Sequence, residues 1–304
     1  MVVNEAHSPP VSPLEEWQEG MRTFVEDALS ASLPVASTRP TVVHEAMRYA
    51  CLNGGKRLRA IFTLAFCEAM GAPQKKALLP ALALEAFHAS TLVHDDLPCM
   101  DDDETRRGKP STHIAFGEAN ALLAGNALLT LSLQWMAETA VPPPHPPGIL
   151  VTELSRAGGS EGVIGGQIED LASEGSEPNE DQLLYIHKEK TARLLSCACR
   201  VGVLCAGGCS SKVDRAGEFG LNLGMAFQIQ DDILDVTLST DELGKPAGSD
   251  QEKGKLTAVS CWGLEESKKR ARDYTTAAHS QLKELDLENS RIAELAESLL
   301  SRSC

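Results

Sequence analysis

The spacing of apolar residues constrains the fold of this chain more than any other feature. In residues 12–33 they include Leu14, Trp17 and Met21, at the three- and four-residue steps of an amphipathic helix. Residues 75–96 and 118–140 are apolar on more than one side, as expected for helices inside a bundle. No segment alternates convincingly like a strand. We therefore predict an all-α fold, a single large helical bundle.

Breaks in this pattern suggest loops rather than domain boundaries. They fall at Gly54-Gly55 and at residues 141–147, 172–181 and 240–255. The proline run at 141–147 cannot be helical, but it separates helices of similar composition. We therefore predict one domain over residues 1–304, with a flexible start at 1–12.

The charge balance excludes some partners. The chain has 43 acidic and 28 basic residues among 304, a net charge of −15, which repels nucleic acid and anionic lipid. An anionic substrate would have to be bound locally, through metal ions or a few cations. No signal peptide and no apolar run long enough to cross a membrane are evident, so we expect a cytoplasmic protein without membrane insertion.

The cysteines indicate a reducing compartment. There are nine, an odd number, and several lie in apolar runs. Cys197, Cys199, Cys205 and Cys209 could be considered a zinc site. Their spacing differs from the usual paired motifs, so we interpret them as packed thiols.

Two acidic motifs end or interrupt apolar helices. Asp95 and Asp96 close one such helix and Asp101 follows, a grouping of carboxylates that suits Mg²⁺. Asp231 and Asp235 share one face of another helix, against a core where uncompensated carboxylates would be costly. Either motif alone could be a solvated surface, but the two together favour metal binding.

Basic residues gather at the predicted loop–helix junctions. They are Lys56, Arg57, Arg59, Arg106, Arg107, Lys109, Lys190, Lys245 and Lys255. Any one could be an ordinary surface residue. As a set beside two acidic motifs they favour a diphosphate site, because Arg binds phosphate bidentately and Lys as a point charge. His88 lies on the same helix face as Asp95, and both a core histidine and a phosphate donor remain open for it.

Six segments in this order resemble the motif set of trans-isoprenyl diphosphate synthases. More narrowly, they resemble bacterial farnesyl and bacterial or plant geranylgeranyl diphosphate synthases, over about residues 40–280. The resemblance implies an all-α bundle around a deep central cavity, usually a homodimer. The segments are GGKRLR, HDDLPCMDDDETRRGKPSTH, GGQIEDL, HKEKTARLL, FQIQDDILD and GKPAGSDQEKGK.

The resemblance also implies roles for individual residues. The catalytic set would be Asp95, Asp96, Asp101, Asp231, Asp232, Asp235 and Lys190. Metal would be held by Asp95, Asp96, Asp101, Asp231 and Asp235, as about three Mg²⁺ ions per site, with Mn²⁺ as an alternative. The residues binding the allylic substrate would be Arg106, Lys190 and Lys245. Isopentenyl diphosphate would bind Lys56, Arg59, His88 and Arg107. The substrate-binding set is completed by Thr191 and Gln228, at the reacting centre, and by Lys255.

The implied reaction condenses isopentenyl diphosphate with dimethylallyl, geranyl or farnesyl diphosphate to give a short-chain all-trans prenyl diphosphate. No side-chain base is evident for the final proton loss. Ala60 and Val259 stand where the family often has Pro, which changes the local backbone restriction without touching a ligand.

Product length should depend on the helix before Asp95, along which the product is expected to grow. Ser90 and Thr91 are small, whereas family farnesyl synthases tend to place an aromatic at the position of Ser90. Phe87 lies nearly one turn deeper, ~4–5 Å along the axis. This predicts geranylgeranyl diphosphate as the main product, with farnesyl diphosphate as the alternative.

Two other classes are compatible with part of the pattern. A terpene cyclase also uses an Asp-rich motif on an α bundle, but GGKRLR and an intact DDILD argue against it. A non-catalytic regulatory subunit would typically lose the Asp motifs, and both are present.

Overall fold

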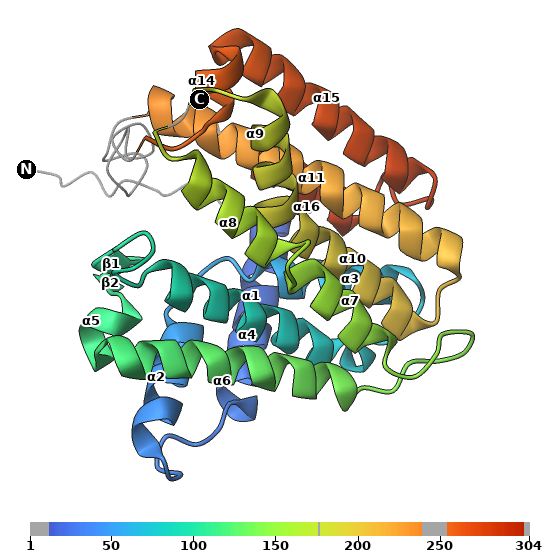
Figure 1. The fold of residues 1–304 in the computed structure, drawn as a ribbon. Coiled ribbons are helices and arrows are strands. Elements are labelled where there is room, and N and C mark those ends of the chain that lie inside the picture. Colours follow the sequence, from blue (N-terminus) through green and yellow to red (C-terminus); the bar gives the residue numbers. More distant parts are fainter. Residues whose placement is uncertain (1–11, 176, 239–253, 301–304) are drawn as a thin grey trace, which may run out of the picture.

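The computed structural model describes residues 12–175, 177–238 and 254–300, and it confirms the all-α prediction (Figure 1). The first half contains α1 (Pro13–Ser32), α2 (Thr41–Leu52), α3 (Leu58–Ala69), the 3₁₀ turn η1 (Gln74–Lys76), α4 (Leu78–Asp95), α5 (Thr112–Phe116) and α6 (Glu118–Ala137). The second half contains α7 (Ile149–Gly158), α8 (Val163–Ser173), α9 (Glu180–Ile186), the π-helix η2 (His187–Ala192), α10 (Arg193–Ala206), α11 (Ser210–Thr237), α14 (Ala258–Trp262), α15 (Leu264–Lys283) and α16 (Arg291–Leu300).

Local signals explain where α1 begins. The side chain of Ser12 accepts a hydrogen bond from the backbone N–H of Glu15, and the Glu15 side chain accepts one from Ser12. This capping box, with Pro13 in the first turn, satisfies donors that a helix start leaves unpaired. Residues 1–11, where we predicted flexibility, lie outside the described residues.

A short hairpin was not predicted. Strands β1 (Thr105–Arg106) and β2 (Lys109–Pro110) pair antiparallel. Between them, Arg107 and Gly108 both have positive φ, at 55° and 74°, as a tight two-residue hairpin turn requires. Strands of two residues are too short for an alternating pattern to reveal.

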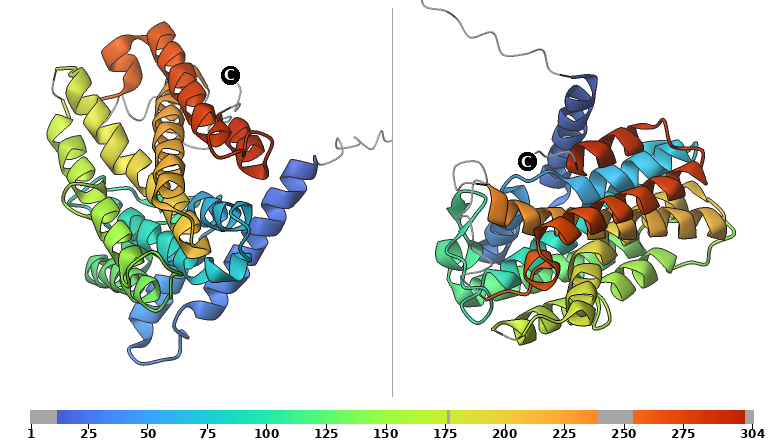
Figure 2. Two further views of the ribbon diagram at one scale, coloured as in Figure 1. Left: turned by 90° about the vertical axis from the view of Figure 1, so that its right-hand side faces the viewer. Right: turned by 90° about the horizontal axis from the view of Figure 1, so that it is seen from above.

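The helices pack in pairs that bring distant segments together. In Figure 1, α4 runs beside α6 in the lower half, and α10 runs beside α3 and α11. Figure 2 shows α15 lying along α11. The ends of α4 and α11, where the two acidic motifs lie, therefore belong to different helix pairs of one bundle.

The core is apolar and closely packed. The ring of Phe219 in α11 contacts those of Phe62 and Phe66 in α3, at centroid distances of 5.9 and 5.5 Å. Cys197, Cys199 and Cys205 are buried, as expected for packed thiols, whereas Cys209 is exposed at the start of α11.

The predicted breaks are largely confirmed. Residues 141–147 connect α6 and α7 without helix. The break predicted at 172–181 is shorter, because α8 continues to Ser173 and α9 begins at Glu180. Most of the loop predicted at 240–255 lies outside the described residues. No helix in the described ranges is both long and apolar enough to cross a membrane.

Candidate active site

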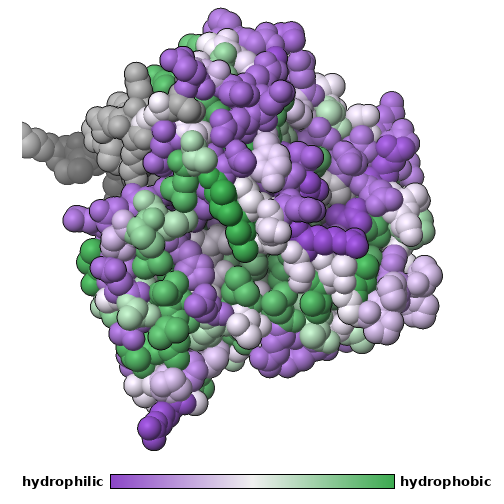
Figure 3. All heavy atoms as spheres, in the orientation of Figure 1, coloured by the Kyte–Doolittle hydropathy of each residue, from purple (hydrophilic) through white to green (hydrophobic). Residues whose placement is uncertain are grey.

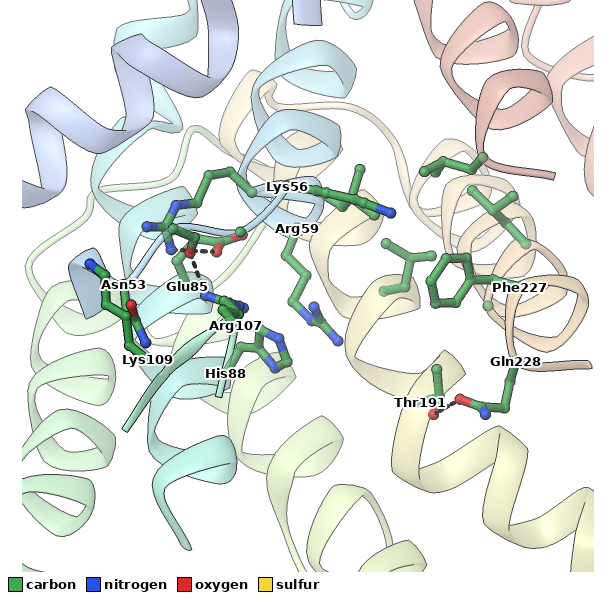
Figure 4. Close-up of a pocket in the computed structure, with 18 residues that line it drawn as sticks. Asn53, Lys56, Arg59, Glu85, His88, Arg107, Lys109, Thr191, Phe227 and Gln228 are labelled. Atoms are coloured by element: carbon green, nitrogen blue, oxygen red, sulfur yellow. Dashed lines mark hydrogen bonds and ion pairs between the residues drawn. The ribbon is translucent and has the colours of Figure 1, made fainter. Parts of the chain in front are cut away.

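The structure brings most of the predicted phosphate-binding residues to two cavities. The first has a volume of about 720 Å³, and its lining includes Lys56, Arg59, His88, Arg107 and Phe227. In Figure 4, Arg59 and His88 extend into it from one side, opposite Phe227. The second has a volume of about 130 Å³, and its lining includes Asp170, His187, Lys190, Asp231, Asp232 and Lys255.

Two residues line both cavities: Thr191 and Gln228. The Thr191 hydroxyl donates a hydrogen bond of 2.9 Å to Oε1 of Gln228 (Figure 4). Molecules in the two cavities would meet at this pair, which we call the shared wall. The resemblance implied that both residues line the reacting centre, and the shared wall is consistent with that role.

The π-helix η2 presents Lys190 and Thr191 to this wall. π-turns frequently occur at functional sites. Neighbouring helices approach the η2 backbone through glycines: a Cβ on Gly166 of α8 would overlap the backbone of Lys190, and one on Gly224 of α11 would overlap Ala192. The position of η2 therefore depends on backbone contact from both sides.

The cations of the GGKRLR segment divide into two roles. Arg57 is buried, donates a 2.8 Å hydrogen bond to the carbonyl of Cys51, and lies 3.7 Å from the carboxylate of Glu85. All three cations of this segment border the first cavity, but only Arg57 is engaged in these contacts within the protein. Arg57 thus stabilises the loop that presents its two neighbours, a division that the sequence did not indicate.

Local hydrogen bonding explains one of the two departures from Pro. The N–H of Ala60 donates to Oε1 of the buried Glu85 at 3.1 Å, a bond that Pro could not make. Val259 is the second residue of α14, where Pro is also tolerated because N–H groups there have no partner within the helix, and nothing in the structure explains this departure.

His88 is held in a low-dielectric, cationic environment. Burial, followed by the charges of Arg59 and Arg107, places the pKa of His88 well below its ordinary value. A neutral imidazole can still donate one N–H to a phosphate oxygen. Since His88 lines the first cavity, the phosphate-donor interpretation is compatible with the structure.

At the end of α4, Asp96 and Arg106 are each other's partners. Nε of Arg106 donates to Oδ1 of the buried Asp96 at 2.9 Å, and its Nη2 lies 3.1 Å from the carboxylate of Asp103. Burial raises the pKa of Asp96, and the hydrogen bond from Arg106 offsets part of that rise. The sequence had assigned these two residues separate ligands, a metal and a diphosphate.

A second ion-pair cluster joins Lys190 and Lys255. Nζ of Lys190 lies 2.6 Å from Asp170, and Nζ of Lys255 lies 3.1 Å from Asp101 and 3.4 Å from Asp170. Burial alone would raise the pKa of Asp170, but the two lysines outweigh it and lower that pKa. Asp170 was missed in the sequence analysis; the signal for it lay in GGQIEDL, of which it is the sixth residue.

Asp95 is the least compensated carboxylate of the first motif. Among the described residues its side chain has no hydrogen-bond or ion-pair partner. Burial raises the pKa of Asp95 to about 6, although the charge of Lys190 opposes the rise. A half-buried carboxylate without a partner is unfavourable, and a bound dication would relieve the cost.

In the second motif the three carboxylates differ. Asp231 and Asp232 both line the second cavity, and Asp232 and Asp235 are buried. Within the described ranges, no three His, Cys, Asp or Glu side chains gather into a ready-made metal site. The donor chemistry fits Mg²⁺ that shares substrate phosphate oxygens rather than a cage built by protein alone. Lys245 lies outside the described residues.

The residues predicted to control product length lie on one turn of α4. The Phe87 ring is 4% exposed and rests on α7, where a Cβ on Gly158 would overlap it. The hydroxyl of Ser90 is buried and donates to the carbonyl of Phe87 at 2.7 Å. Thr91 donates to the carbonyl of His88 at 2.9 Å. Ser90 and Thr91 therefore direct their polar atoms at the helix backbone.

Comparison with known proteins identifies the family. The Polyprenyl synthetase family model matches residues 40–294. The heterodimeric geranylgeranyl pyrophosphate synthase large subunit 1, chloroplastic, of Arabidopsis thaliana is 41% identical over 278 residues, which cover 90% of this chain and 74% of the relative. The chain belongs to the polyprenyl synthetase family, and the resemblance seen in the motifs is confirmed.

Solved structures of similar sequence also match the fold of this chain. Geranylgeranyl pyrophosphate synthetase from the archaeon Geoglobus acetivorans matches with a TM-score of 0.84 at 28% identity, covering 96% of this chain and 99% of that one. A geranyltransferase from Helicobacter pylori, complexed with magnesium and isoprenyl diphosphate, matches with a TM-score of 0.79 at 31% identity, covering 96% and 98%.

The uncompensated Asp95 carboxylate predicts a pH-dependent cost in stability. Its folded pKa of about 6 lies above the ordinary 3.8, so the folded state binds the proton more tightly than the unfolded state. Without metal, Asp95→Asn should raise the free energy of unfolding at about pH 7.5 by about 2–3 kcal/mol. The gain should shrink as the pH falls from about 6 to about 4, where the wild-type carboxyl is also neutral.

Chemical denaturation in EDTA at several pH values measures this difference. Asp273→Asn, on an exposed part of α15, is the matched control and should change stability by less than about 0.5 kcal/mol. A variant at Asp95 no more stable than wild type at about pH 7.5 would show that the carboxylate is compensated.

Proposed function

We propose that this chain is a geranylgeranyl diphosphate synthase, a prenyltransferase that condenses isopentenyl diphosphate with allylic diphosphates. The observation that carries the proposal is the pair of cavities meeting at Thr191 and Gln228. A reaction that joins two anionic substrates needs two cationic pockets with one common boundary.

In the proposed reaction, isopentenyl diphosphate lies in the first cavity. Lys56 and Arg59 bind its diphosphate, the arginine bidentately, and neutral His88 donates one N–H. Since these groups stand on α3, its preceding loop and α4, the diphosphate is fixed while the hydrocarbon end extends toward Thr191 and Gln228.

The allylic diphosphate lies on the other side of this boundary. Lys190 and Lys255 exchange Asp170 and Asp101 for diphosphate oxygens and stabilise the charge that grows on the leaving group. Asp95 and Asp231, supported by Asp96, Asp101 and Asp235, would hold Mg²⁺ between the two acidic motifs and the diphosphate. When bound, Mg²⁺ supplies further positive charge at the leaving diphosphate.

Bond formation takes place where the cavities meet. The allylic C–O bond breaks, and its electron pair leaves with the diphosphate. The double bond of isopentenyl diphosphate then attacks the carbocation, which the two binding sites hold in reach. A proton is lost to the departing diphosphate, so no side-chain base is required.

Labelled isopentenyl diphosphate, offered in turn with dimethylallyl, geranyl and farnesyl diphosphate, tests this function. We expect incorporation with each, a twenty-carbon main product, and none in EDTA. Asp95→Asn should lower the rate at least about 10²-fold, while the control Asp273→Asn remains active. Cyclised product without isopentenyl incorporation would indicate a terpene cyclase, and no turnover at all a regulatory subunit.

We further propose that Phe87 closes the cavity in which the product grows. Its ring is backed by Gly158, so it has no space to move toward α7, and it lies nearly one turn deeper than Ser90. A chain stopped at Phe87 instead of Ser90 is longer by about one isoprene unit. This position supports a geranylgeranyl rather than a farnesyl product.

Chromatography of the products of Phe87→Ala and Ser90→Phe tests this assignment. Phe87→Ala should shift the products beyond twenty carbons, and Ser90→Phe should shift them toward farnesyl diphosphate. Thermal unfolding of both variants serves as the control, because Ser90 is fully buried and the larger ring can destabilise the core. Unchanged product length in Phe87→Ala would remove Phe87 as the stop.

A homodimer through α5 and α6 is proposed as the assembly. Ile114 and Leu123 are 52% and 58% exposed, with Leu122 beside them, and apolar side chains gather over this region in Figure 3. An apolar face of neighbouring helices is suited to a second copy of the same chain. The matched Arabidopsis large subunit is named heterodimeric, so a different partner is the alternative.

Light scattering of the double variant Leu122→Glu/Leu123→Glu tests the dimer. Wild type should be dimeric and the variant monomeric, because two buried charges per copy would oppose association. Val35→Glu, at a residue 65% exposed and outside α5 and α6, should stay dimeric. A wild-type monomer, or a double variant that remains dimeric, would contradict the proposed interface.

The single domain over residues 1–304 and the cytoplasmic location stay predictions. The matched Arabidopsis relative is described as chloroplastic, so a chloroplast is the alternative location. Immunofluorescence in the source cells distinguishes the two.

A further inference from the structure

The carboxylate of Asp232 accepts hydrogen bonds from other groups of the protein. It is 3% exposed. Oδ1 accepts from Nε2 of Gln228 at 3.0 Å, and Oδ2 accepts from the backbone N–H of Ala258 at 2.6 Å. Nε2 of His187 lies 3.2 Å from Oδ2. Two N–H groups thus donate to one carboxylate and a histidine ring nitrogen lies beside it, a set of partners that suits structural positioning rather than metal ligation.

These contacts fix the direction of the hydrogen bonds at the shared wall. A carboxylate accepts only, so Gln228 must present its NH₂ group to Asp232 and its carbonyl oxygen to Thr191. The Thr191 hydroxyl must then donate to Gln228, as observed. The hydroxyl proton of Thr191 is therefore bound to Gln228. Only the lone pairs of the Thr191 oxygen remain available to a molecule where the two cavities meet.

The direction matters because a carbocation forms at this boundary. An oxygen lone pair facing the cation stabilises it, whereas an O–H group pointing at it would oppose it. We infer that Asp232 is a positioning residue that sets the polarity of the Gln228–Thr191 pair toward the reacting centre. This inference rests on the proposed condensation and deepens it, since it gives the second acid of DDILD a role distinct from that of Asp231.

The same carboxylate anchors a second part of the site. Ala258 is the first residue of α14 and lies three positions after Lys255. Its bond to Asp232 ties the Lys255 segment to α11. Loss of the carboxylate could therefore act through Lys255, through folding or through Thr191, and the experiment has to distinguish these routes.

Asp232, Gln228 and Thr191 form a chain of hydrogen bonds, which we call the relay. Asp232→Asn reverses the donor and acceptor roles along this relay with little change in side-chain shape. The single amide oxygen must accept from the N–H of Ala258, the present partner of Oδ2, so the new NH₂ group faces Gln228. Gln228 then turns its oxygen toward residue 232 and its NH₂ toward Thr191, whose proton is released toward the cavity. We expect kcat to fall about 10²-fold, with KM for isopentenyl diphosphate changed less than about 3-fold.

A double-mutant cycle with Thr191→Val isolates the proposed route. Valine keeps the shape and removes the hydroxyl. In this background, Asp232→Asn should lower kcat less than about 3-fold further, because the group it acts through is absent. If Asp232→Asn lowers kcat about 10²-fold in both backgrounds while the wild type performs the condensation, the inference about Asp232 is wrong. If the wild type does not perform the condensation, the proposed function itself is wrong.

Three further measurements exclude the other roles. The Mg²⁺ concentration for half-maximal rate should not change in Asp232→Asn, and an increase would identify Asp232 as a metal ligand. Thermal unfolding and metal-free calorimetry of isopentenyl diphosphate binding should match wild type. If Asp232→Asn does not fold, Gln228→Leu interrupts the same relay: its loss of kcat should also be non-additive with Thr191→Val, and additivity would overturn the inference.

Discussion

The site depends on the pairing of buried carboxylates with a few cations. Lys190 and Lys255 are held by Asp170 and Asp101, on α8 and just after α4, so the lysines are in place before a substrate arrives. In a chain of net charge −15, this arrangement gathers two lysines at one location and balances their charge with the protein's own carboxylates. A diphosphate has only to replace carboxylates as the partner of the lysines.

Much of the fold could be predicted because helical periodicity and breaks are local properties. The predicted segment 118–140 coincides with α6 except at its end, and the apolar stretch before Asp95 is α4. Most motif residues do converge on the two cavities. Their order in the chain was informative because each motif ends a helix or lies in a turn of the same bundle.

The pairing of side chains could not be predicted in the same way. Arg106 reaches Asp96 only because an unpredicted turn, with positive φ at Arg107 and Gly108, folds the chain back. Asp170 becomes significant only when α8 packs beside η2. Adjacent Asp231 and Asp232 have the same chemistry in the sequence, yet successive residues of a helix point about 100° apart, so their environments differ.

The shared wall of Thr191 and Gln228 also bears on how one site can carry out several rounds of the same condensation. If each product can return as the next allylic substrate, its diphosphate occupies the same lysines and its reactive carbon returns to the same pair of side chains. Only the hydrocarbon tail changes between rounds, and it extends away from the bond-forming atoms. One fixed junction can therefore serve successive additions, while the number of rounds is decided elsewhere in the molecule.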